Sequence, residues 1–370
     1  MANPHQHVVD YFSPHPIDEV GLTDIRNLFA ESMFNCLHTE LGPNDLLEID
    51  SFISELEIDM GVKFPPHTVG TLPSLMRLHH DPVHAYAKPL LYYASVMGGD
   101  MSSDLVLWCL GFRRGQAGVL SYWVLECDTS VDTFVVEKQN PLLFIHGVGL
   151  GLVTYITFIS ALLFSFKGSR RPPIILLELP HVSMKLNVDR IPSMPETVQG
   201  ISSILKSNGF QRAQFVVHSL GSFVFGAVQH LKPAIVAGVV LIDPVCFKLW
   251  EPGVMSNFCY RDPTTPMQIL MHYHITHELT INHYFHRHFM WTDCVMFANN
   301  LPRQTSVVLS ELDEIIDARG VREYLQRYPG VHIEMLSGRH HGEWNVHINS
   351  MTVVVKTVMD MSRNLNTNVC

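Results

Sequence analysis

The stretch Phe215-Val216-Val217-His218-Ser219-Leu220-Gly221-Ser222 decides the fold. It joins an apolar, β-rich run directly to a helical pattern, which predicts a strand that turns at once into a helix with Ser219 at the turn. Such a turn strains the serine backbone and exposes its hydroxyl, and it favours small residues two positions before and after the serine. Gly221 meets this requirement and Val217 does not, so a serine that only caps a helix is the alternative interpretation.

Strand-like and helical patterns alternate on both sides of this turn. Apolar, β-rich runs occupy residues 141–145, 174–179, 236–242, 305–309 and 331–336, and helical patterns occupy 154–164, 196–207, 319–327 and 348–361. Continuous Val/Ile/Leu runs that alternate with helices predict an α/β fold with a mostly parallel sheet covered by helices on both faces. In such a sheet the active site lies at the carboxyl ends of the strands.

The remaining segments predict the domain organisation. Residues 1–103 are expected to form a helical N-terminal extension, with helical spacing at 25–36 and 46–58. A hairpin over 105–112 and 119–125 then opens the α/β core, which comprises 104–246 and 304–370. Residues 247–303 form an insertion into that core, and we expect it to act as a lid.

A glycine turn follows the run at 141–145, with the sequence His146-Gly147-Val148-Gly149. A backbone N–H of this turn can face the serine. With the N–H of Leu220 it would give two donors for an oxyanion that develops during acyl transfer. We expect Val148 to supply this donor, with Gly149 as the alternative; a glycine turn that serves only packing is the simpler interpretation.

A nucleophilic serine needs a histidine base and an orienting carboxylate. In this strand–helix arrangement they follow in the order serine, acid, histidine. Asp313 comes just after the run at 305–309, and His341 comes just after the run at 331–336, with Gly342 behind it. The sequence therefore predicts Ser219, Asp313 and His341 as the catalytic residues.

Other residues compete for these roles. Asp243 follows the run at 236–242 and is the alternative acid, although it could equally be a turn residue. His340 is the alternative base, and it could also be a surface histidine in a chain with 22 histidines. Glu311 and Glu314 are expected to be solvated.

These motifs resemble the α/β-hydrolase superfamily, and the chain is most similar to a fungal and algal group of its members without assigned substrates. The resemblance covers the chain from Asp104 onward, through residues 141–152, 218–221, 243–247, 313–316 and 341–343, and weakly 80–83 and 89–90. It implies Ser219 as nucleophile, Asp313 as acid, His341 as base, and backbone donors at Val148 and Leu220. Relatives usually carry glycine where this chain has Val217.

The predicted lid is rich in Met, Phe, Tyr and Trp, which suits an apolar ester and equally suits packing of the lid onto the core. It also carries the pairs His274/His277 and His283/His286, whose spacing could chelate a metal. No Asp, Glu or Cys completes such a ligand set, so we expect these to be exposed helix histidines and predict no metal and no cofactor.

Composition excludes several classes of protein. Lys+Arg 25 against Asp+Glu 35 gives a net charge of −10, which argues against a nucleic-acid-binding protein. The seven scattered cysteines, which include Cys370, indicate free thiols in a reducing compartment. The first seven residues show no secretory signal. Residues 142–164 lack formal charge, but their glycines and His146 indicate a buried strand, turn and helix rather than a membrane span, so a cytoplasmic location is expected.

Three functions fit these observations. The first is a serine hydrolase that cleaves a carboxylic ester, apolar in its acyl part or lipid-like, through an acyl-enzyme. The second is an acyltransferase or lyase that uses the same residues. The third is a non-catalytic binding protein in which Val217 disrupts the strand–helix turn at Ser219. The expected partner is a small ester or lipid substrate, and peripheral membrane contact is a further option; the sequence does not indicate the oligomeric state.

Overall fold

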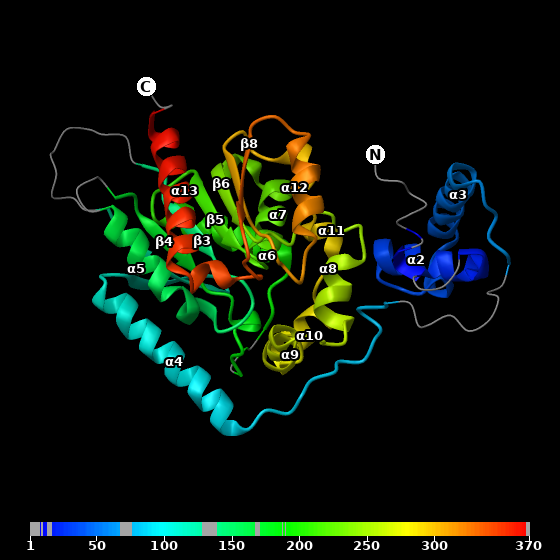
Figure 1. Ribbon diagram of the computed structural model, residues 1–370, viewed down its shortest axis with the longest axis horizontal. Helices are drawn as coiled ribbons and strands as arrows, with labels where there is room; N and C mark the ends of the chain where they lie inside the picture. Colours follow the sequence, from blue (N-terminus) through cyan, green and yellow to red (C-terminus); the bar gives the residue numbers. More distant parts are fainter. Residues whose placement is uncertain are drawn as a thin grey trace.

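An 8-stranded sheet in the order β1-β2-β4-β3-β5-β6-β7-β8 forms the centre of the molecule (Figure 1). The computed structural model describes residues 8, 10–12, 17–66, 76–127, 139–166, 171–186, 188 and 190–367. The strands are β1 (Arg113–Ala117), β2 (Leu120–Leu125), β3 (Leu142–Ile145), β4 (Ile174–Leu177), β5 (Ala213–His218), β6 (Val236–Ile242), β7 (Thr305–Ser310) and β8 (Val331–Leu336). The first seven residues and Cys370, on which two of the sequence expectations rest, lie outside the described residues.

The sheet is parallel from β4 to β8, and only the β1–β2 hairpin and the β2–β4 pair are antiparallel. Strands β3 to β7 are buried along their whole length, which explains their continuous apolar sequences. The α/β class with a mostly parallel sheet is therefore confirmed.

Helices cover both faces of the sheet. On one face lie α5 (Ile156–Ser165) and α13 (Ile348–Thr367), and on the other lie α6 (Met194–Ser207), α7 (Gly221–Leu231) and α12 (Ala318–Gln326) (Figure 1). Each face has its own apolar core, one around Phe158 and Trp344 and the other around Phe215 and Phe225. Burial on two faces fixes the sheet between the helices, so the ends of its strands hold the connecting loops in place.

The uncharged segment at 142–164 forms strand β3, a glycine turn, a short 3-10 helix (Gly151–Tyr155) and helix α5, as predicted. Gly149 and Gly151 have positive φ values of 132° and 63°, which interrupt any continuous helix. In the described ranges we find no helix that combines the length and the apolar character needed to cross a bilayer.

The strand predicted at 105–112 is wrong. Residues up to Cys109 belong to helix α4 (Leu90–Cys109), and the hairpin is formed by β1 and β2 instead. Leu107 is fully buried in the core on the α5 face, so packing selects the helix for an apolar run whose length and composition fit either structure. The helix also runs across the predicted domain boundary between residues 103 and 104.

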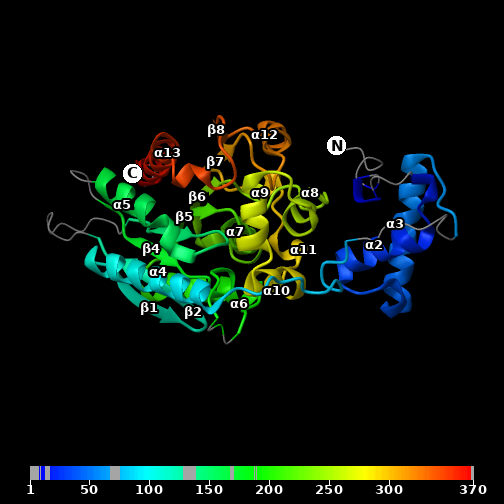
Figure 2. The ribbon, with the colours of Figure 1, turned by 60° about the horizontal axis from the view of Figure 1, so that its bottom comes forward.

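The N-terminal extension contains two helical patterns, as predicted: α2 (Leu22–Phe34) and α3 (Pro43–Met60), which pack around Ile25, Ile49 and Ile53. Figure 2 shows this pair at one end of the molecule, and residues 82–89, which form neither helix nor strand, lead into α4. The pair contacts the 247–303 insertion, since the indole N–H of Trp291 donates to the Ser32 carbonyl at 2.6 Å.

The 247–303 insertion consists of short helices. They include α8 (Gly253–Met255), a π-helix (Ser256–Tyr260), α9 (Pro266–Met271), a second π-helix (His272–Thr276), α10 (Leu279–Arg287) and α11 (Trp291–Cys294). Many of the apolar side chains of the insertion, among them Phe258, Phe285 and Phe289, belong to the core on the α7 side of the sheet. The insertion therefore packs firmly on the body of the molecule, and its role as a lid stays a prediction.

Candidate active site

Strand β5 passes into helix α7 within three residues, and Ser219 lies at this turn. Its φ is +50°, in the left-handed region that a side chain rarely adopts. A Cβ atom on Gly221 would lie 2.4 Å from the carbonyl oxygen of Ile145, so only glycine fits there. The strained serine and the obligatory glycine are the features predicted from the sequence for this turn.

Val217 does not prevent the turn from forming. It lies in β5 opposite Ile145 and Leu241, and its side chain is fully buried in the core on the α7 side. The valine thus contributes apolar burial to the core, while Ser219 keeps its positive φ.

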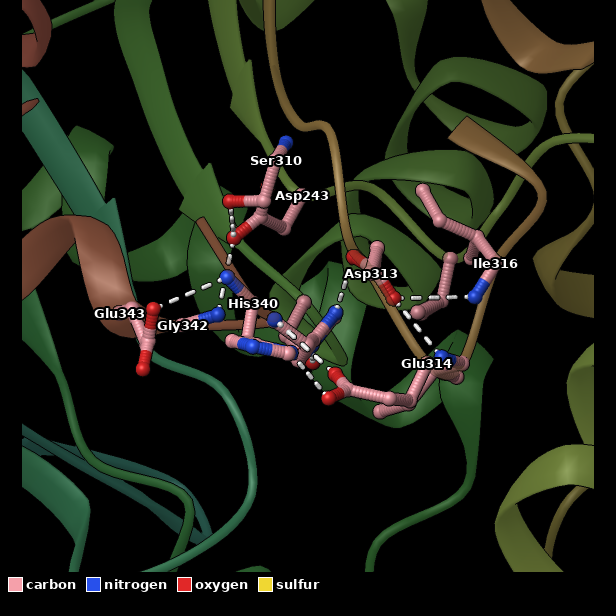
Figure 3. A network of polar contacts seen from close by, with 12 residues as sticks. Asp243, Ser310, Asp313, Glu314, Ile316, His340, Gly342 and Glu343 are labelled. Atoms are coloured by element: carbon pink, nitrogen blue, oxygen red, sulfur yellow. Dashed lines mark hydrogen bonds and ion pairs between the residues drawn. The ribbon is translucent and has the colours of Figure 1, made fainter. Parts of the chain in front are cut away.

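Ser219, His341 and Asp313 form a continuous chain of hydrogen bonds. His341 Nε2 lies 2.8 Å from Ser219 Oγ, and His341 Nδ1 lies 2.6 Å from Asp313 Oδ2. The other oxygen of Asp313 accepts from the N–H groups of Ile315 and Ile316 at 2.8 and 3.0 Å (Figure 3). These backbone donors fix the carboxylate, which in turn orients the imidazole ring.

The electrostatics of His341 are set by two opposing effects. Burial lowers the pKa of the ring, but the neighbouring carboxylate of Asp313, its hydrogen bond, and the charges of Asp243 and Glu314 raise that pKa, with a net result of about 9. The site therefore stabilises the imidazolium form, which is the form a general base takes after it accepts a proton.

Asp243, the alternative acid, forms hydrogen bonds with Ser310 and Gly342. It is fully buried with a φ of +41°, and it accepts from the N–H and the hydroxyl of Ser310 and from the N–H of Gly342 (Figure 3). The carboxylate thus ties the end of β7 to the loop that carries His341, without a hydrogen bond to the ring. Burial raises the pKa of Asp243 to about 6.

His340, the alternative base, contacts Glu314, while the imidazole bonded to Ser219 Oγ is that of His341. Nδ1 of His340 forms the short contact with Glu314, and the backbone N–H of His340 donates to Glu343 at 3.0 Å (Figure 3). The expectation that Glu314 is solvated is wrong, because only 11% of its side chain is exposed. The loops after β7 and β8 fold together here, and they enclose Glu314 between them.

The two proposed oxyanion donors lie beside Ser219. Val148 and Leu220 both line a small cavity together with Ser219. In the part of the chain that the structure describes, neither N–H donates to a protein acceptor, whereas the N–H of Gly149, the alternative, donates to the Val182 carbonyl at 3.0 Å. This difference favours Val148 over Gly149 as the second donor, and the oxyanion roles of Val148 and Leu220 stay a prediction.

One contact in the site was not predicted. The hydroxyl of Tyr155 lies 2.7 Å from Nδ1 of His218 and accepts from the N–H of Gly147 at 3.2 Å. It links the glycine turn after β3 to the residue before Ser219. Burial lowers the pKa of His218 well below its usual value, which favours the neutral ring in this contact. Only the position of His218 beside Ser219 could have signalled this link.

Among the described residues, one group of three side chains has the spacing of a metal site. The carboxylates of Asp243 and Asp313 and the ring of His341 place ligand atoms within 4.8 Å of one another. Their oxygen and nitrogen atoms already take part in the hydrogen bonds given above, which suits proton transfer. No lid histidine in the described ranges belongs to a group of three possible ligands.

A larger cavity of about 620 Å³ lies beside His341, which is part of its lining. The lining also includes Val96 and Gly99 of α4, Met271 and Ile275 of the insertion, and Val148 of the glycine turn. Helix α4 of the N-terminal extension and the insertion together therefore enclose the approach to the histidine.

No model of a known protein family and no curated protein matches the sequence. Solved structures with a similar fold include a bacterial membrane phospholipase A, 15% identical, with 74% of this chain and 94% of that chain covered and a TM-score of 0.51. A carboxylesterase of the thaumarchaeon Nitrososphaera gargenis is 15% identical, with 68% and 99% covered and a TM-score of 0.49. The topology of the sheet and the first of these likenesses establish one conclusion: the chain has the α/β-hydrolase fold.

Proposed function

We propose that the protein is a serine hydrolase that cleaves a carboxylic ester, with Ser219 as nucleophile, His341 as base and Asp313 as the acid that orients it. The observation that carries the proposal is the hydrogen-bond chain from Ser219 Oγ through both nitrogens of His341 to Asp313. The positive φ of Ser219 supports it, because a strained serine at this turn has its hydroxyl held toward the base.

The reaction follows from this arrangement. Ser219 Oγ attacks the ester carbonyl as its proton passes to His341 Nε2, and Asp313 stabilises the imidazolium that forms. The N–H groups of Val148 and Leu220 hold the oxyanion; one such donor typically contributes about 3 kcal/mol to transition-state stabilisation. His341 then returns the proton to the leaving alcohol. A water molecule, activated by the same histidine, releases the acid from Ser219.

The proposal is tested with a fluorophosphonate probe, which phosphonylates an activated serine. We expect the native protein to be labelled and Ser219→Ala not to be labelled. Ser102→Ala, which removes an exposed hydroxyl on α4, is the matched control and should be labelled like the native chain. Equal labelling of the native protein and Ser219→Ala would contradict the proposal and favour a binding protein.

A second experiment tests the assignments of the acid and of the base. Asp313→Asn removes the charge that contacts His341, and we expect kcat for ester hydrolysis to fall by roughly 10⁴-fold, as in other sites of this kind. His340→Ala alters a side chain that faces Glu314, and should change kcat little. A larger loss in His340→Ala than in Asp313→Asn would assign the base to His340.

A further inference from the structure

Two cavities of very different size flank the Ser219–His341 pair. The smaller one has a volume of about 20 Å³ and is walled by Ser219, Leu220, Phe223, Phe258 and Phe285. Since a single water needs about 10–15 Å³ measured in this way, the smaller cavity has room for a group of methyl or ethyl size. The larger one, of about 620 Å³, can take a long apolar group.

The chemistry of the reaction assigns the two halves of the ester to these cavities. The alkoxide that leaves must receive its proton from His341, so the alcohol half lies within hydrogen-bond reach of that ring. His341 lines the larger cavity and does not line the smaller one. The acyl half stays bonded to Ser219 Oγ, and both Ser219 and Leu220 lie in the wall of the smaller cavity.

The walls of the larger cavity define the chemistry of the alcohol. Val96 of α4 lines it together with Met267, Leu270, Met271 and Ile275 of the insertion. Of the polar side chains there, Glu314 is engaged by His340, and the hydroxyls of Tyr92, Ser95 and Thr154 donate to backbone carbonyls. The His274 ring stacks on Tyr92. An apolar alcohol fits this lining, and a sugar or a charged headgroup would leave its polar atoms unpaired.

We infer that the substrate is an ester of a short acyl group with a long apolar alcohol, an inference that rests on the proposed function. This places the apolar part of the substrate on the alcohol side, whereas the sequence suggested an apolar acyl part. The Ser219 Oγ–acyl carbon bond forms as the bond from that carbon to the alcohol oxygen breaks. The proton of Ser219 passes through His341 to this oxygen. Water then gives the free short-chain acid and the unchanged enzyme.

Octyl acetate and ethyl octanoate test the inference, because they are isomers that differ only in which half carries the long chain. We expect kcat/KM to be at least about tenfold higher for octyl acetate, since chain length in an apolar pocket gives discrimination of this order. An equal or higher value for ethyl octanoate overturns the inference. Loss of fluorophosphonate labelling, by contrast, would overturn the proposed function itself.

Two variants sharpen the result. Phe258→Ala widens the smaller cavity and is expected to raise kcat/KM for ethyl octanoate several-fold relative to octyl acetate. Val96→Trp fills the larger cavity and should lower kcat/KM for octyl acetate more than for ethyl acetate. Met101→Trp, on the exposed face of the same helix, is the matched control. It should leave unchanged the kcat/KM ratio of ethyl octanoate to octyl acetate and that of octyl acetate to ethyl acetate. A change in Met101→Trp as large as that in Val96→Trp would show that the effect does not arise in the cavity, and would contradict the inference.

Discussion

The geometry at Ser219 depends on two glycines, Gly147 in the turn after β3 and Gly221 at the start of α7. A Cβ on Gly147 would lie 2.9 Å from the Cβ of Ser219, and a Cβ on Gly221 would lie 2.4 Å from the Ile145 carbonyl oxygen. The second clash is with backbone, which cannot move aside as a flexible side chain can. Glycine is therefore required at 221 for steric reasons, although its own φ is not positive.

Gly221→Ala is expected to destabilise the fold by about 1–3 kcal/mol, because overpacking at a backbone contact forces the turn to shift. Fluorophosphonate labelling of Ser219 should fall with it. Gly98→Ala is the matched control. Nothing lies within 4 Å of the added methyl group on α4, so this variant should gain about 0.5–1 kcal/mol. Chemical denaturation measures both, and equal stability of the two variants would contradict the steric argument.

The pH dependence of activity should report the charges around His341. The ring must be neutral to accept a proton, and its pKa is raised to about 9, so kcat/KM should rise with pH toward that value. The groups that face the ring are Asp313, Asp243 and Glu314, with the neutral His218 ring 5.7 Å away. Because the pKa is raised above 6.5, the same interactions stabilise the folded chain at low pH, and this contribution is lost as the pH rises through about 9.

Asp243→Asn removes one of these negative charges while its amide oxygen can still accept from Gly342. The imidazolium then loses stabilisation, so the pKa of His341 should fall and the rise in kcat/KM should move to lower pH. Asp360→Asn, at a partly exposed ion pair far along α13, should not shift the profile. If Asp243→Asn lowers kcat at every pH without such a shift, Asp243 acts only as a structural tie.

At this scale the sequence predicted much of the candidate site. Ser219, Asp313 and His341 could be chosen because each follows its own strand, and parallel strands bring their carboxyl ends to one edge. The place of Glu314 could not be predicted in this way. Its burial depends on how two loops of irregular conformation fold against each other, and no periodic pattern encodes that.

At the scale of elements, the sequence was less informative where an apolar run is compatible with both a helix and a strand. The six parallel strands β3–β8 were predicted from their apolar, β-rich runs between helices. The run at 105–112 is equally apolar, yet it continues a helix that begins at Leu90. Local preference is similar for both structures here, so the burial of Leu107 against α5 decides between them.

One contact between α4 and the insertion is made through Glu278. This fully buried residue caps α10 by accepting from the N–H groups of Thr280 and Ile281, and it also accepts from the Tyr93 hydroxyl at 3.0 Å. Glu278→Ala should cost the cap about 1 kcal/mol and speed amide exchange in α10. Tyr93→Phe should loosen only the link to α4. Identical exchange patterns in the two variants would show that the cap and the link are not separate.

At the scale of the whole molecule, the site is completed by a part of the chain that the sequence assigned to a separate extension. Deletion of residues 1–110 removes α4, with the cavity-lining residues that it carries, and keeps Ser219, His341 and Asp313. We expect this shortened chain to keep fluorophosphonate labelling but to lose its preference for octyl acetate over ethyl acetate, because one wall of the larger cavity is gone. Retention of the full preference, measured as the ratio of kcat/KM values, would assign that preference to the insertion alone.

Helix α4 and the short helices of the insertion line the larger cavity, whereas Ser219, His341 and Asp313 lie in turns at the ends of strands. On the proposed function, the residues that cleave the ester and those that select its alcohol therefore belong to different segments of the chain. Substitutions in α4 or in the insertion are expected to change which alcohols are accepted and to leave the catalytic residues unaltered.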